Sequence, residues 1–61
     1  MSKYQVGDYF EIYSFDENDS SLVSSIREVM DTIEGVLYGF YGLNNEIMWM
    51  TEEYLDGRKK L

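Results

Sequence analysis

The sequence predicts an α+β fold in which one helix packs on a three-stranded antiparallel sheet, in the chain order β-α-β-β. Three observations predict it. Apolar residues between positions 21 and 34 recur at helical spacing. Segments rich in aromatic and β-branched residues lie on both sides of that stretch, and an Asn-Asn pair divides the second of them. With 61 residues, the chain has material for one small domain spanning residues 1–61.

The first strand is predicted from about Tyr9 to Phe15, where aromatic and β-branched residues are dense. Successive side chains of a strand point to opposite faces, so Phe10 and Ile12 share one face. These two residues are therefore expected to face the core.

The helix is predicted over residues 21–34. Ser20 or Asp19 can cap its N-terminus, and Gly35 occupies the position at which a left-handed residue often ends a helix. Its serine and β-branched residues lower the intrinsic helix propensity, so tertiary packing must stabilise it. The apolar residues fall within an arc of about 120°, the width of a core-facing stripe; they are Leu22, Val23, Ile26, Val29, Met30 and Ile33.

Two further strands are predicted after the helix, from Val36 to Leu43 and from Glu46 to Thr51. A tight turn at Asn44-Asn45 joins them, because asparagine tolerates positive φ better than most residues. One helical turn is expected from Glu52 to Asp56. The basic segment Arg58–Leu61 is expected to be a flexible tail.

A surface interface is predicted from the sheet order. If neighbouring strands run antiparallel, the last strand lies between the other two, and its apolar residues suit a central position. One helix covers only one face of such a sheet, so the other face exposes an apolar patch of the kind that marks interfaces. A homodimer that buries this patch also enlarges a small core. The predicted interface residues are Leu37, Tyr41, Met48 and Met50.

A second architecture is an all-β small barrel. Residues 6–12 (Val-Gly-Asp-Tyr-Phe-Glu-Ile) and 48–55 (Met-Trp-Met-Thr-Glu-Glu-Tyr-Leu) resemble the first and last strands of a small SH3-like barrel. That resemblance implies a strand over residues 24–31. The adjacent apolar pairs Leu22-Val23 and Val29-Met30 interrupt a period of two, which favours the helix.

The charge distribution indicates the class of partner. The net charge is −7, and residues 4–57 contain all twelve acids but only one base, Arg27. Such a chain repels nucleic acid and anionic membranes and attracts basic proteins, although the same charge also serves solubility. No apolar run approaches the roughly 20 residues that span a bilayer, so a cytoplasmic location is expected.

The residue inventory argues against an enzyme. The chain has no cysteine and no histidine, which excludes thiol and imidazole catalysis and removes the common zinc ligands. The acidic run over residues 16–20 does not fit a calcium-binding EF-hand loop, because the required glycine and glutamate positions are Ser21 and Arg27. We expect no catalytic residue, no cofactor and no metal site.

Function is predicted from composition as well. Small acidic chains without cysteine or histidine are similar to the inhibitors that phages and mobile elements direct against basic DNA-binding or defence proteins. The first hypothesis is therefore a non-enzymatic inhibitor or DNA mimic that does not bind nucleic acid directly. The alternatives are a structural or homodimeric assembly module and a small-molecule sponge with a pocket at a subunit interface. The acids expected to contact a basic partner are Asp16, Glu17, Asp19, Glu28, Asp31, Glu34, Glu52 and Glu53.

Overall fold

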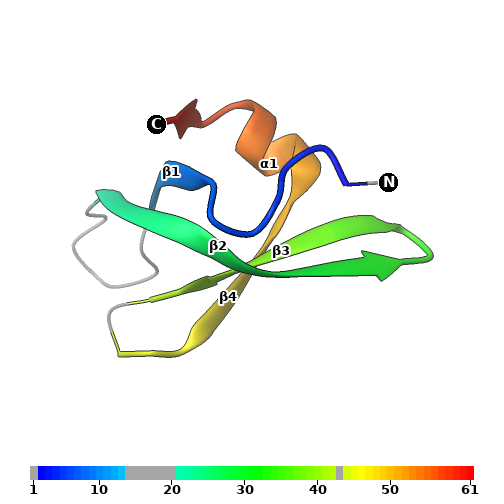
Figure 1. The fold of residues 1–61 in the computed structure, drawn as a ribbon, viewed down its shortest axis with the longest axis horizontal. Coiled ribbons are helices and arrows are strands. Elements are labelled where there is room, and N and C mark those ends of the chain that lie inside the picture. The colour runs from blue at the N-terminus through cyan, green and yellow to red at the C-terminus, as the bar shows by residue number, and fades with distance from the viewer. Residues whose placement is uncertain (1, 14–20, 43) are drawn as a thin grey trace.

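The structure is a computed structural model that describes residues 2–13, 21–42 and 44–61. These residues form an antiparallel sheet with the strand order β4-β3-β2-β1-β5 and one short helix (Figure 1). A combination of antiparallel sheet and helix is confirmed, but the sheet has five strands where three were predicted. The elements are β1 (Tyr9–Tyr13), β2 (Ser21–Thr32), β3 (Gly35–Tyr41), β4 (Ile47–Thr51), α1 (Glu52–Asp56) and β5 (Lys59–Lys60).

The predicted helix over residues 21–34 is wrong, because residues 21–32 form the long strand β2. Its first part pairs with β1 and its second part pairs with β3. The register shifts between Ile26 and Glu28, so Arg27 is an extra residue in a β-bulge. The strand over residues 24–31 that the barrel alternative required is therefore present, although residues 48–55 divide between β4 and α1.

A tight turn joins β2 to β3 and explains why residue 35 is a glycine. This glycine has φ +131°, a conformation that residues with a side chain rarely adopt. The Thr32 hydroxyl donates a hydrogen bond of 2.6 Å to the Gly35 carbonyl and accepts one of 3.2 Å from the Glu34 N–H. Gly35 thus serves a hairpin, where the sequence analysis placed it at the end of a helix.

The core contains the two residues predicted to face it from β1. Phe10 and Ile12 are fully buried, as expected from their shared face. The rings of Tyr4 and Phe40 meet Phe10 edge-on, with centroid distances of 4.9 and 6.2 Å. Such edge-to-face pairs add to the hydrophobic contribution of the buried rings. The buried apolar residues are Phe10, Ile12, Ile26, Tyr38, Phe40, Met48, Met50 and Leu55.

The predicted exposure of Met48 and Met50 is wrong. They lie opposite Phe40 and Tyr38 on β3 and are only 4% and 5% exposed. Because the large rings of β3 face the core, the strand register directs both methionines inward with them. The strand β4 also lies at an edge of the sheet and not at its centre.

The predicted helical turn is confirmed as α1. Thr51 is its N-cap, and the Thr51 hydroxyl accepts a hydrogen bond of 3.1 Å from the Tyr54 N–H. The helix packs on the core through Leu55, whose side chain is fully buried. No helix in the described part of the chain is long and apolar enough to cross a membrane.

The C-terminal residues 58–61 are not the flexible tail that was predicted. Lys59 and Lys60 form β5, which pairs with β1, and the Leu61 N–H donates to the Tyr9 carbonyl at 2.9 Å. The Arg58 side chain also donates to the Glu11 carbonyl at 3.2 Å. Backbone pairing thus fixes the end of the chain beside its first strand (Figure 1).

Candidate functional site

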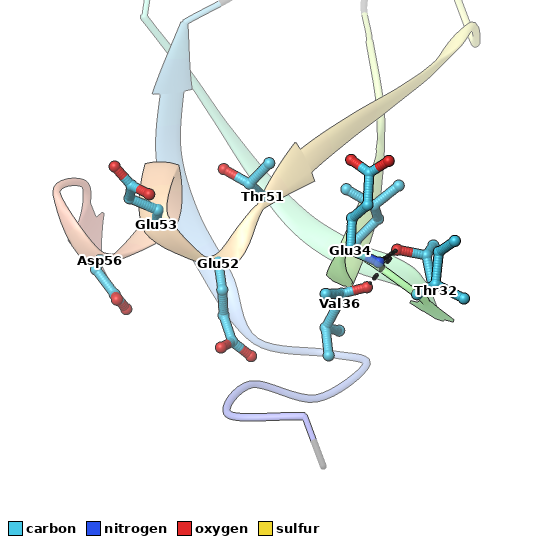
Figure 2. Close-up of a pocket in the computed structure, with 10 residues that line it drawn as sticks. Thr32, Glu34, Val36, Thr51, Glu52, Glu53 and Asp56 are labelled. Carbon is cyan, nitrogen blue, oxygen red and sulfur yellow. Dashed lines mark hydrogen bonds between the residues drawn. The ribbon is translucent and has the colours of Figure 1, made fainter.

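An open hollow lies between the β2–β3 turn and the start of α1 (Figure 2). Residues 32–37 line it from the turn and β3, and Thr51, Glu52, Glu53 and Asp56 line it from the other side. We call it the acidic hollow, because its charged lining residues are the carboxylates of Glu34, Glu52, Glu53 and Asp56.

Three of the predicted partner-binding acids line the acidic hollow. Glu34 comes from the turn, whereas Glu52 and Glu53 come from the first turn of α1. The Thr51 cap fixes where the helix starts, and acidic side chains are favourable near the positive end of a helix. Asp56, which was not among the predicted acids, is the fourth carboxylate of the lining.

Glu52 is held by a hydrogen-bond network inside the protein. The Tyr38 hydroxyl donates to the Glu52 carboxylate at 2.5 Å, and the Lys3 N–H donates to it at 3.0 Å. The N–H groups of Lys3 and Tyr4 also donate to the Tyr38 hydroxyl, at 3.0 and 3.2 Å. The hydrogen bond from Tyr38 lowers the pKa of Glu52, while burial and that same bond raise the pKa of Tyr38.

Asp56 also binds the N-terminal segment, through Tyr4 and Lys3. Its carboxylate accepts a hydrogen bond of 2.6 Å from the Tyr4 hydroxyl and forms an ion pair of 3.0 Å with the Lys3 ammonium. The Tyr4 bond and then the Lys3 bond lower the pKa of Asp56. Glu52 and Asp56 therefore bind the N-terminal segment to the helix, and Glu34 and Glu53 are exposed.

Lowering the pH is expected to destabilise the fold through Glu52 and Asp56. Both carboxyl groups have a pKa below the ordinary values of 4.5 and 3.8. A lowered pKa stabilises the folded state above the ordinary value, and this stabilisation is lost as the pH falls through the lowered pKa. We expect the urea midpoint to decrease below about pH 4.5, and to decrease less in the double variant Glu52→Gln, Asp56→Asn.

The control for this titration is Glu53→Gln, which removes an exposed carboxylate from the same helix. It should keep the acid sensitivity of the unmodified chain. If Glu53→Gln and the double variant change the urea midpoint at low pH equally, the loss of stability in acid does not come from Glu52 and Asp56.

The other predicted acids do not join the acidic hollow. Glu28 pairs with Gly39 and Asp31 pairs with Val36, and residues three apart on a strand point to opposite faces. A helix would bring Glu28, Asp31 and Glu34, which are three residues apart, to one side of the molecule, and the observed strand does not. Asp16, Glu17 and Asp19 lie outside the described residues.

A second surface covers the outside of β2, β3 and β4. Cross-strand register places Met30 beside Leu37, and Tyr41 beside Ile47, on the face opposite the core. Met30, Tyr41 and Ile47 are 43%, 40% and 36% exposed. Two of the four predicted interface residues, Leu37 and Tyr41, therefore lie here, whereas Met48 and Met50 do not. We call this surface the outer face; it consists of Met30, Leu37, Tyr41, Ile47 and Trp49.

Trp49 lies against the sheet at Gly39. A β-carbon added at Gly39 would be 3.0 Å from the ring atom Cζ3 of Trp49 and 2.9 Å from Cδ1 of Ile47. The glycine thus leaves the space that both side chains occupy. A glycine inside a strand signals such close approach, but the register that pairs Gly39 with Trp49 is not visible in the sequence.

Arg27 closes one end of the outer face. Its guanidinium lies 4.7 Å from the centre of the Tyr41 ring, within the range of a cation–π contact. The bulge at Arg27 adds a residue at this point of β2. A positive charge therefore lies at the Tyr41 end, whereas the acidic hollow lies at the Leu37 end.

Comparison with known proteins finds no family model, no curated protein and no solved structure that the chain matches. Within residues 2–13, 21–42 and 44–61, no group of three or more acids is placed to hold a metal ion. The interpretation of this site therefore depends on its own geometry and charge.

Proposed function

We propose that the protein is a non-enzymatic binding domain that docks a basic surface of another protein in the acidic hollow. One observation carries this proposal: carboxylates from a turn and from a helix far apart in the sequence line the same concavity. Glu34, Glu52 and Glu53 were predicted from the sequence to have the same role.

The charge of the chain supports the proposal. A concave surface lined by one sign of charge concentrates its electric field and raises the rate at which oppositely charged partners arrive. The net charge of −7 extends that attraction beyond the hollow. Glu34 and Glu53 are exposed and can pair with lysine or arginine side chains. Glu52 and Asp56 position the helix through their hydrogen bonds with Tyr38 and Tyr4.

Inhibition is the use of this binding that we favour. An acidic domain that occupies a basic nucleic-acid-binding surface competes with the phosphate backbone for it. The composition of the chain is similar to that of inhibitors that phages and mobile elements direct against defence proteins, and we propose the same class of role for it. Its acidic composition and the hollow support the role, and a binding experiment can test it.

The test uses a short oligolysine peptide as the probe and isothermal titration as the measurement. We expect the double variant Glu34→Gln, Glu53→Gln to weaken binding about three- to tenfold at low salt, because it removes two exposed ion pairs. Binding to the unmodified chain should also weaken strongly in about 0.5 M NaCl, where surface charges are screened.

The matched control is the double variant Glu11→Gln, Glu46→Gln, which makes the same change in net charge away from the hollow, on β1 and just before β4. It should weaken binding clearly less than the hollow variant. An equal loss in both variants would mean that the peptide responds to net charge alone and would overturn the hollow as a site.

A further inference from the structure

We propose that the outer face selects the partner, and that its occupant is a partner protein that carries an exposed apolar side chain next to its basic residues. This inference rests on the proposed function, because the basic residues of that partner are those that the acidic hollow receives. In this proposal the acidic hollow binds the basic residues of the partner, and the outer face distinguishes partners by their apolar side chain.

The first step is the apolar content of the outer face. Met30, Tyr41 and Ile47 are all more than one-third exposed, and they adjoin the partly buried Leu37 and Trp49 by cross-strand register. Contiguous exposed apolar groups of this kind mark interaction sites more often than isolated ones. Tryptophan and tyrosine are also the residues that most often dominate binding energy at interfaces.

The second step is the preorganisation of Trp49. Its ring already packs at Gly39, so little side-chain freedom remains to be lost when a partner covers it. Ile47 packs at the same glycine, which supports the ring from the neighbouring position of β4. The centre of the outer face is therefore a firm platform for an apolar side chain.

The third step is continuity with the acidic hollow. Leu37 and Thr51 are cross-strand partners, and both also line the hollow. Leu37 is two residues from Gly39 along β3, a distance of about 7 Å. A single partner segment can thus contact Trp49 with an apolar side chain and reach the hollow with a neighbouring basic one.

The fourth step is the charge around the outer face, which argues for a basic partner and against a second copy of the chain. Glu28 lies in the same cross-strand row as Gly39 and Trp49. A dimer through this face would bring together two chains that each have a net charge of −7. Arg27 at the Tyr41 end directs the basic part of the partner toward the hollow, since like charges repel.

The experiment compares two short peptides with the same number of lysines. One alternates lysine with phenylalanine and the other alternates lysine with serine. We expect the unmodified chain to prefer the phenylalanine peptide about tenfold or more, as one buried aromatic anchor contributes at least this much. Trp49→Ala should remove most of that preference and leave the affinity for the serine peptide unchanged.

Tyr41→Ser keeps the test valid if Trp49→Ala does not fold, because Tyr41 is exposed and its loss leaves the core intact. Tyr41→Ser should reduce the preference for the phenylalanine peptide. The matched control is Tyr9→Ser, which removes a tyrosine that is 53% exposed on β1, outside the outer face. It should keep the preference of the unmodified chain.

The possible failures are distinct. An unchanged preference in the Trp49 and Tyr41 variants overturns the role of the outer face, while the response to Glu34→Gln, Glu53→Gln still supports the hollow. Loss of that response, with the aromatic preference retained, overturns the proposed function instead. A dimer of the protein alone, seen by light scattering and dispersed by Tyr41→Ser, would show that a second copy occupies the outer face and would overturn the proposed partner.

Discussion

Replacing Met50 with glutamate is expected to unfold the protein. Met50 is 5% exposed and lies opposite the fully buried Tyr38, so the new carboxylate would be placed in the core without a partner. An uncompensated buried charge costs about 3 to 5 kcal/mol. A core of this size supplies a net stability of about the same magnitude. The variant should therefore show no cooperative urea transition when followed by circular dichroism.

Ile47→Glu in the same strand is the matched control. Ile47 is 36% exposed on the outer face, so a glutamate there can reach water, and we expect a cost of about 1 kcal/mol or less. A folded Met50→Glu together with an unfolded Ile47→Glu would mean that β4 presents its other face to the core.

Tyr38→Phe is expected to reduce the free energy of unfolding by about 1 to 3 kcal/mol, because it removes several hydrogen bonds, one of them to a charged group. The change removes one hydroxyl, but that hydroxyl donates to Glu52 and accepts from the N–H groups of Lys3 and Tyr4. The phenyl ring itself still fills the core. The measurement is the urea midpoint near neutral pH.

Tyr41→Phe provides the comparison, because it deletes the hydroxyl of a tyrosine that is 40% exposed. That hydroxyl can bond to water, so its loss should change the free energy of unfolding by less than about 0.5 kcal/mol. Equal effects at Tyr38 and Tyr41 would show that the hydrogen bonds of Tyr38 add nothing to stability.

Local patterns predicted several elements of this fold correctly. The burial of Phe10 and Ile12 followed from the period of two in the first strand. The helical turn at Glu52–Asp56 formed as expected. Asn45 has φ 63°, the positive value anticipated for the turn between the last two long strands. Each of these features depends on residues that are close in the sequence.

The failed helix prediction has a specific physical cause in β2. A bulge at Arg27 shifts the alternation by one residue, so Leu22, Ile26 and Val29 all pack on the core. Their spacing of four and then three residues is the spacing of a helix face. Ile33 extended the apparent stripe, yet it lies in the turn and is fully exposed. A one-residue bulge thus imitates helical periodicity, and only strand pairing distinguishes the two.

The candidate site was predicted in part without that helix, because Glu52 and Glu53 follow the last long strand in either fold. Glu34 was selected as the last residue of the predicted helix, and it reaches the site from the β2–β3 turn instead. The prediction for β4 placed alternate residues on opposite faces correctly, but it assigned the core to the wrong face. The predicted helix would have covered the face of Ile47, which is exposed, and would have left Met48 and Met50 uncovered. The register between strands decides which face is buried, and a single sequence does not reveal that register.

The pairing of β5 with β1 joins the two ends of the chain and is expected to form late in folding. The Arg58 side chain and the Glu11 carbonyl that it contacts are 47 positions apart, and the Lys3–Asp56 pair spans 53. Contacts this distant require most of the chain to be ordered before they contribute any stability, which lowers the folding rate. We therefore expect the β2–β3 hairpin to form early and the junction of the two chain ends to form last. Folding should consequently be slow for so short a chain.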